Sequence, residues 1–258
     1  MMGDRFNFLK ILKVIEENHL TFFKSYELAE RLEVEPKSIQ NYLETLANNE
    51  LILRIEKGKY CRTYVKDPLV LGANLVIGGV ISHHTALIHH GLAPDTSPEV
   101  FVSSNHQKSN KRFLGYYFRF IRIRPNKYFG FKDENNETGS FRVTDPEKTI
   151  LDCFDLPHYS ARYDQLLDIF RNTELDEAKL TTYGVRMGNL SVLKRLAFLT
   201  EHYGMTGFGK FRKMVSNLLN EKYTLLDPSG PELGPFCSKW RIRNNMSLSS
   251  MPSNRSMY

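Results

Sequence analysis

Residues 25–60 have the sequence SYELAERLEVEPKSIQNYLETLANNELILRIEKGKY, which predicts the fold of the N-terminal part of the chain. Ser25 is suited to N-capping, and the following Leu28 and Leu32 lie on one face of a short amphipathic helix. Pro36 then fits the first position of a second helix, because its φ is already helical and that position needs no N–H donor. The stretch therefore predicts two short helices joined by a tight turn.

The second predicted helix has an apolar face and a polar face. Ile39, Leu43 and Leu46 fall at i, i+4 and i+7, so they share the buried side. The outward residues near its start supply donors for guanine and phosphate and bidentate amides for adenine. These residues are Lys37, Ser38, Gln40 and Asn41. A helix of this kind is typical of DNA recognition.

A basic hairpin is predicted directly after this helix. Residues 51–60 alternate like a strand, turn at Lys57 and Gly58, and resume as a second strand. Glu56 is the sole acid between positions 54 and 66, so the hairpin can lie against a phosphate backbone. The side chains expected there are Arg54, Lys57 and Lys59.

An earlier helix completes the predicted N-terminal fold. Phe8, Ile11 and Ile15 share one face, which gives a three-helix core beneath the hairpin. Three helices and a basic hairpin predict a winged helix-turn-helix, and double-stranded DNA becomes the leading partner. The alternative is a protein-interaction module, because small winged helices also serve that role and residues 1–66 carry only a slight positive charge.

Length, charge and cysteine content limit the other possibilities. The chain has 258 residues, enough for two domains, and its formal charge of +6 favours an anionic partner. Its cysteines form no CxxC pair, which argues against a zinc site or a disulfide framework and fits a reducing compartment. Charged residues interrupt the N-terminus, and no apolar run reaches the roughly 20 residues of a membrane-spanning helix. We expect a cytoplasmic protein without a membrane partner.

The predicted fold class is α+β, with a C-terminal mixed domain of several helices and a small antiparallel sheet. A winged-helix domain is expected over residues 1–66 and a linker with a buried element over residues 67–80. An α+β domain of the antitoxin type is expected over residues 81–222. Residues 223–258 form an extension whose Ser, Asn and Met rich tail, after Asn244, is expected to be disordered.

A short helix is predicted where the second domain begins. Ser82 can cap its start and Gly91 suits its C-terminal end. Four histidines lie in it, at positions 83, 84, 89 and 90, so the two pairs are five to seven residues apart. Ligands on one helix need a spacing of three or four residues, so we expect no metal site there and no cofactor.

The strand-like region that follows carries one-sided charge. Strands are expected at 100–103, 117–123, 128–131 and 141–143, and no acid occurs between positions 99 and 133. Basic residues among aromatic residues are typical of a nucleic-acid surface, but the aromatic side chains can equally be the inner face of the sheet. The sequence leaves both readings open. The basic residues are Lys108, Lys111, Arg112, Arg119, Arg122, Arg124 and Lys127.

The remaining sequence is mainly helical and holds no complete catalytic motif. Asp145 and Pro146 predict a helix start, and further helices are expected at 163–171, 189–203 and 208–221. A (D/E)xK nuclease motif fails because Pro146 stands two residues before Lys148. Gly204 to Lys210 matches part of a phosphate-binding loop, but Phe211 follows where Ser or Thr would ligate magnesium. We therefore expect no catalytic residues and no enzyme.

Three elements in a fixed order carry a resemblance to a known family. They are the hairpin at residues 53–60, ISHHTAL at 81–87 with HGL at 90–92, and VTDPEKTILD at 143–152. Over about residues 5–220 the chain resembles the AbiEi family of antitoxins and transcriptional regulators from type IV toxin–antitoxin, abortive-infection systems. The resemblance implies an autorepressor that binds inverted repeats through the N-terminal domain. It also implies a C-terminal domain that neutralises a cognate nucleotidyltransferase toxin, with or without a stable complex.

Two other functions remain open at the level of sequence. A stand-alone winged-helix transcription factor, with a ligand-sensing or dimerising C-terminal domain, shares every feature given above. A metal-dependent nucleic-acid-processing enzyme would use the acids around one helix, although these acids are more simply a cap and a solvated face. Those acids are Asp145, Glu147, Asp152 and Asp155. A neighbouring gene for a nucleotidyltransferase would favour the antitoxin.

Overall fold

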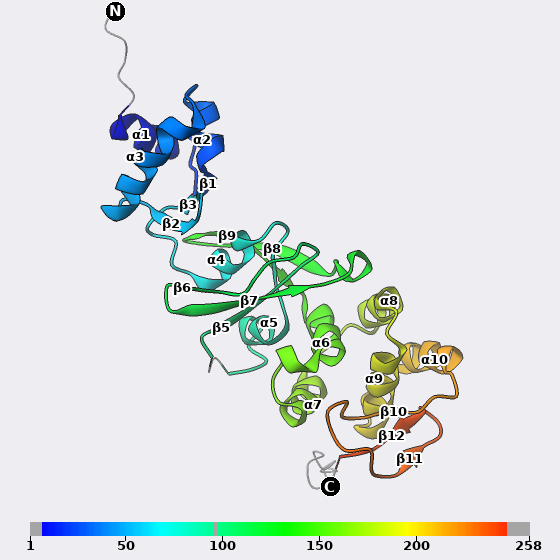
Figure 1. Ribbon diagram of the computed structural model, residues 1–258. Helices are drawn as coiled ribbons and strands as arrows, with labels where there is room; N and C mark the ends of the chain where they lie inside the picture. The colour runs from blue at the N-terminus through cyan, green and yellow to red at the C-terminus, as the bar shows by residue number, and fades with distance from the viewer. Residues whose placement is uncertain (1–6, 95–96, 247–258) are drawn as a thin grey trace, which may run out of the picture.

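The computed structural model describes residues 7–94 and 97–246 and has a mixed α+β fold (Figure 1). Three successive parts are distinguished here by residue range. They are the N-terminal unit (residues 7–66), the sheet unit (residues 67–155) and the helical unit (residues 156–246). Within the described ranges, no helix is both long enough and apolar enough to cross a membrane.

The N-terminal unit contains three helices packed beside a small antiparallel sheet. Its elements are α1 (Phe8–Glu17), β1 (Phe22–Lys24), α2 (Ser25–Arg31), α3 (Pro36–Asn48), β2 (Leu53–Glu56) and β3 (Lys59–Cys61). The sheet has the order β1-β3-β2. Helices α1, α2 and α3 bury Ile11, Leu28 and Leu43 in one core, where the rings of Phe23 and Tyr60 also stack. Periodicity located these helices because each has one continuous apolar face.

Strand β1 was not predicted from the sequence. It pairs with β3 in antiparallel register, Phe23 opposite Tyr60, and extends the hairpin into a three-stranded sheet. Its three residues are too few to give a recognisable alternation. The strand leads directly into α2, so the backbone of Lys24 sits at the start of that helix and is bonded by the Glu27 side chain.

The sheet unit is built on a mixed sheet with the order β6-β7-β5-β4-β9-β8. Its strands are β4 (Val80–Ile81), β5 (Glu99–Ser104), β6 (Lys111–Phe113), β7 (Tyr116–Arg122), β8 (Phe131–Asn136) and β9 (Gly139–Thr144). Strands β5 and β7 are parallel, as are β4 and β9. The prediction of an antiparallel sheet was therefore wrong for these pairs. The β6–β7 hairpin places β6 on the outer edge, which leaves β7 to pair with β5 in parallel.

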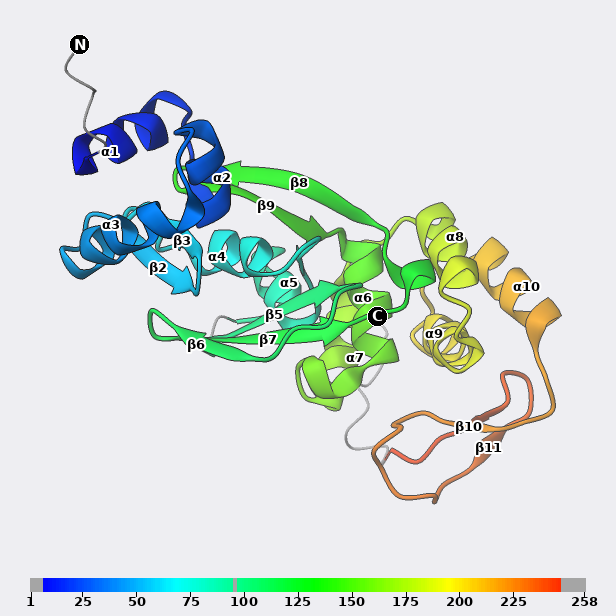
Figure 2. The same ribbon diagram turned by 45° about the horizontal axis from the view of Figure 1, so that its top comes forward.

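Helices cover both faces of this sheet (Figures 1 and 2). The helix α4 (Pro68–Leu75) lies on one face, so closely that a Cβ on Gly72 would be 3.0 Å from Val102. On the opposite face are α5 (His83–His89) and α6 (Pro146–Asp155). The segment predicted as a linker with a buried element thus forms α4 and β4, both inside the core.

The helical unit contains four helices, of which α8 and α9 pack against α6 and α10 packs against α8 and α9, and it ends in a small sheet. Its helices are α7 (Tyr163–Asn172), α8 (Glu177–Met187), α9 (Leu190–His202) and α10 (Gly209–Leu218), and its strands are β10 (Thr224–Leu225), β11 (Phe236–Cys237) and β12 (Ile242–Arg243). A short 3-10 helix, Pro157–Tyr159, precedes α7, and another, Pro125–Lys127, lies between β7 and β8 of the sheet unit. Helix α8 was not predicted. Of the tail expected to be disordered, residues 247–258 lie outside the described residues.

Candidate nucleic-acid interface

The polar face of α3 is open to solvent. Lys37, Ser38, Gln40 and Asn41 are all exposed, whereas the apolar residues of the helix are buried. The amide of Gln40 donates to Glu44 Oε1 over 3.2 Å, one turn further along α3. Arg54 on β2 lies 3.8 Å from the same carboxylate. Glu44 thus links α3 to the hairpin and restrains two of the candidate residues.

The hairpin side chains point in different directions. Lys57 is exposed at the turn, where Gly58 has a φ of +71° that suits glycine. Lys59 is partly buried, and its Nζ donates to the backbone oxygen of Asn74 at 2.5 Å. Burial lowers the pKa of Lys59, the nearby Glu56 carboxylate opposes that shift, and repulsion from Lys108 adds to it. The prediction placed Lys59 against phosphate, but its ammonium contacts the C-terminal end of α4 instead.

Several predicted basic residues of the sheet unit are paired with acids from elsewhere in the chain. Lys108 Nζ lies 2.5 Å from Glu56 Oε1 in the hairpin. Lys111 donates to the backbone oxygen of Ile55 and is also near Glu56. The one-sided charge seen in the sequence is therefore partly neutralised by the N-terminal unit. These contacts hold the hairpin against the sheet unit.

The rest of this basic set divides between paired and exposed groups. Arg119 lies 2.7 Å from Glu99, and Lys127 lies 2.5 Å from Asp155. Arg112, Arg122 and Arg124 are exposed, and Arg112 packs over the ring of Tyr117. The seven residues therefore do not form one free surface.

The aromatic residues of the same region favour the inner-face reading. Phe118 is fully buried, and Phe113, Tyr116 and Phe120 pack against the core that contains it. Their alternation with basic residues follows from the pleat of the strands, because successive side chains point to opposite faces. Stacking of bases on these rings is not needed to explain their presence.

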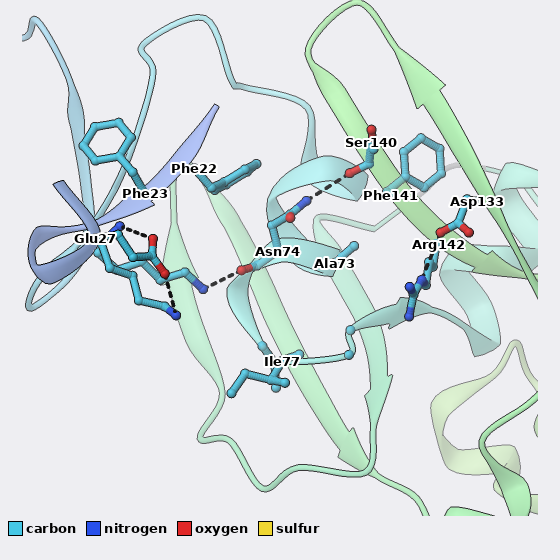
Figure 3. A pocket seen from close by; sticks show the side chains of 15 residues that line it. Phe22, Phe23, Glu27, Ala73, Asn74, Ile77, Asp133, Ser140, Phe141 and Arg142 are labelled. Carbon is cyan, nitrogen blue, oxygen red and sulfur yellow. Dashed lines mark hydrogen bonds and ion pairs between the residues drawn. The ribbon is translucent and has the colours of Figure 1, made fainter. Parts of the chain in front are cut away.

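A cleft of about 440 Å³ separates the N-terminal unit from the sheet unit (Figure 3). Residues of β1, α2 and β3 line one wall, and the C-terminal end of α4, the loop after it, β8 and β9 line the other. The lining residues are Phe22, Phe23, Lys24, Glu27, Lys59, Ala73, Asn74, Val76, Ile77, Gly78, Gly79, Asp133, Ser140, Phe141 and Arg142. Nothing in the sequence pattern signalled this cleft, because its residues come from four separate segments.

A buried polar cluster lies between α5 and α6. Lys148 donates to Asp152 Oδ1 one turn later on α6, and both side chains are almost fully buried. His83 begins α5 with a φ of +52°, and its Nδ1 is 2.9 Å from Ser82 Oγ. Burial lowers the pKa of His83 to about 3, and the nearby Lys148 adds to that shift. Ser82 was predicted to cap α5, but its hydroxyl instead contacts His83 and Ser103.

The other acids of the proposed processing site are bound into local structure. Asp145 caps α6 by accepting from the Lys148 backbone and also accepts from the Tyr183 hydroxyl. Glu147 accepts from the Asp176 backbone. Within residues 7–94 and 97–246 no three His, Cys, Asp or Glu side chains are grouped so that they could hold a metal ion.

Comparisons with known proteins give a likeness of fold. No protein-family model matches the chain, and no curated protein matches it in sequence. Among solved structures the chain is similar to the crystal structure of the RV2827C protein from Mycobacterium tuberculosis, with a TM-score of 0.59 and 11% sequence identity. The match covers 93% of this chain and 92% of that chain, so the likeness extends across all three units.

Proposed function

We propose that the chain binds double-stranded DNA through α3 and the β2–β3 hairpin, as a winged helix-turn-helix. The observation that carries this proposal is the polar face of α3, where Lys37, Gln40 and Asn41 are exposed side by side with Ser38. Amide and ammonium groups on one helix face can contact base edges and phosphates in a major groove. Arg54 and Lys57, on the adjacent hairpin, would contact the flanking phosphates.

The biological role that we propose is that of an AbiEi-type autorepressor and antitoxin. The resemblance of the ISHHTAL and VTDPEKTILD segments supports it, and both segments lie in the packed contact between α5 and α6. In this role the protein would bind operator repeats in its own promoter and counteract a nucleotidyltransferase toxin. Growth of cells that express the neighbouring toxin gene, with and without this chain, tests the second activity. Equal growth arrest in both would refute it.

The DNA proposal is tested with the full chain and two duplexes. Purified protein is titrated against its own upstream DNA and against a scrambled duplex at two salt concentrations. We expect tighter binding to the upstream DNA. The triple variant Lys37→Ala/Gln40→Ala/Asn41→Ala should lose most of that preference, since each good bidentate base contact contributes about 1–3 kcal/mol. If Lys37 contacts a phosphate, its loss should also reduce the slope of log binding constant against log salt concentration by about the contribution of one phosphate.

A matched control separates base contacts from net charge. Lys213 is exposed on α10, far from α3 along the molecule (Figure 1). Lys213→Ala removes one positive charge, as the triple variant does, and should leave the preference for upstream DNA unchanged. Unchanged operator affinity in the triple variant would refute the assignment of α3.

A second candidate function is a transcription factor whose DNA binding responds to a small molecule. The cleft between the N-terminal unit and the sheet unit favours it, because a ligand there would contact both. This candidate shares the DNA-binding face and differs in having no toxin. The toxin experiment above distinguishes the two.

A further inference from the structure

The cleft between the N-terminal unit and the sheet unit has the size of a small-molecule site. Its volume of about 440 Å³ lies within the range of roughly 300–1,000 Å³ that ligand pockets usually occupy. Figure 3 shows side chains from β1, α2, α4, the loop after α4, β8 and β9 around one space. The walls come from both units, so an occupant would contact the two together.

The floor of the cleft is held by close packing and hydrogen bonds. A Cβ on Gly79 would lie 2.3 Å from the backbone oxygen of Ala73, so this turn admits no side chain. The Tyr128 hydroxyl donates to the backbone oxygen of Gly78 at 2.9 Å, and the Asn74 amide donates to that of Ser140 at 3.0 Å. The cleft is therefore formed before any ligand enters.

Two of the charged pairs that line the cleft are internally balanced. Lys24 Nζ lies 3.2 Å from Glu27 Oε1, and Arg142 Nε lies 2.9 Å from Asp133 Oδ1. Neither pair needs a further counter-ion. The remaining lining cation is Lys59, and its environment differs from theirs.

Lys59 presents a partly desolvated cation that lacks a carboxylate partner. In residues 7–94 and 97–246 no carboxylate oxygen lies within 4.0 Å of its Nζ, which donates to the backbone oxygen of Asn74. An ammonium group has three donors, so others remain for a ligand. Glu56 attracts this ammonium only from beyond ion-pair distance, and an anion in direct contact would offset more of the cost of its partial burial.

The rim of the cleft adds apolar surface. Ile77 is 70% exposed beside it, and the partly buried ring of Phe22 lines the opposite wall. Figure 3 shows Phe22 and Ile77 on opposite sides of Asn74, whose backbone oxygen accepts from Lys59 Nζ. We propose that this cleft binds a small organic anion, whose carboxylate or phosphate group pairs with Lys59 and whose apolar part contacts Phe22 and Ile77.

The bound anion would couple the sheet unit to the N-terminal unit. Its charged group would contact Lys59 of β3, and its apolar part would contact Ile77 of the sheet unit. If DNA and the ligand prefer different arrangements of the two units, or the same one, the ligand changes DNA affinity. The size of that change is limited by the difference between its binding free energies for the two arrangements. This effect on DNA rests on the proposed function, whereas binding of the anion does not.

Binding is tested without DNA by NMR titration of the full chain with three probes. Benzoate and phenyl phosphate carry the two candidate anionic groups, and benzamide is the neutral counterpart of benzoate. We expect saturable shifts of cleft resonances with at least one anion and on the order of tenfold weaker binding of benzamide, the factor that about 1.4 kcal/mol provides. Which anion binds more tightly identifies the preferred group. The proposal would be overturned if neither anion gave saturable shifts, or if benzamide bound as tightly as the anions.

Variants locate the site. Lys59→Met should weaken anion binding on the order of tenfold, while Lys213→Met, an exposed control with the same charge change, should bind as the parent does. Ile77 is exposed, so the variants Ile77→Asp and Ile77→Lys should both fold. The added negative charge of Ile77→Asp should weaken anion binding, and the added positive charge of Ile77→Lys should strengthen it. If Lys59→Met bound the anion as tightly as the parent, the anion would lie elsewhere. The same would follow if Ile77→Asp and Ile77→Lys did not change the affinity in opposite directions.

Discussion

Replacing Lys148 by Met is expected to destabilise the fold strongly, because it leaves a buried carboxylate without its cation. The side chains of Lys148 and Asp152 are 1% and 5% exposed, and the ammonium donates to Asp152 Oδ1. Asp152 Oδ2 has no hydrogen-bond partner among the described residues. The ammonium also lies 5.2 Å from the ring centroid of Phe129. Lys148 is thus the main group that offsets burial of this carboxylate.

The magnitude follows from the burial of both partners. Removing one member of a buried ion pair costs about 3–5 kcal/mol, whereas replacing both by apolar residues of similar size is often neutral. Lys148→Met should therefore lower the free energy of unfolding by about 3–5 kcal/mol, and Lys148→Met/Asp152→Leu should recover most of it. Such a loss is a large part of the roughly 5–15 kcal/mol that stabilises a folded protein. Urea denaturation measures it.

The pH dependence of this loss gives a second check. Burial raises the pKa of Asp152, and Lys148 opposes that rise. Without Lys148 the pKa rises further, so the folded variant takes up a proton that the unfolded chain binds only at lower pH. The penalty is then full above the folded pKa and shrinks as pH falls toward the unfolded pKa of about 3.9. Destabilisation should be larger near neutral pH than in mild acid.

A surface lysine provides the matched control. Lys13 lies 3.6 Å from Glu17 one turn later on α1, and both side chains are well exposed, so Lys13→Met should cost no more than about 1 kcal/mol. A loss of stability in Lys148→Met as small as that of Lys13→Met would refute the reasoning, as would failure of the double variant to recover stability.

Two further predictions concern buried or crowded positions. Burial lowers the pKa of His83 to about 3, so its ring should stay neutral in an NMR titration through its ordinary value of 6.5. Neutral His83 therefore contributes stability that is fully present above pH 6.5 and is lost as the pH falls toward about 3. An NMR titration midpoint near 6.5 would contradict this prediction. Gly79→Ala should destabilise more than Gly209→Ala in urea, because the new Cβ would meet the Ala73 oxygen at 2.3 Å, whereas nothing lies within 4 Å at Gly209 and neither glycine has a left-handed φ. Equal costs would contradict the packing argument.

Local sequence patterns predicted the elements that depend on neighbouring residues. The Asp145 cap and Pro146 located the start of α6, and the Asp145 side chain accepts from the Lys148 backbone as a cap does. The apolar spacing of Ile39, Leu43 and Leu46 predicted the buried face of α3. These features are fixed within a few residues, so one stretch of sequence contains the information.

Strand pairing and charge pairing depended on distant residues and were predicted poorly. The alternation of β5 and β7 located both strands but could not tell that they are parallel, because direction depends on which strands become neighbours. Lys108 seemed free in a stretch without acids, yet its partner Glu56 is 52 residues away. After such pairing, three of the seven basic residues of that stretch remain exposed, namely Arg112, Arg122 and Arg124.

The boundary at residue 66 illustrates the same limit in packing. The sequence predicted a separate domain over residues 1–66, because helix and strand patterns end there. Ile55, Cys61 and Val65 nevertheless share a core with α4 and the sheet unit. Lys59 and Glu56 add polar contacts to the same junction. Cutting the chain at this point would expose that apolar surface, so the stability of the hairpin beside α3 depends on the sheet unit. A DNA-binding assay therefore tests α3 and the hairpin together only in the full chain.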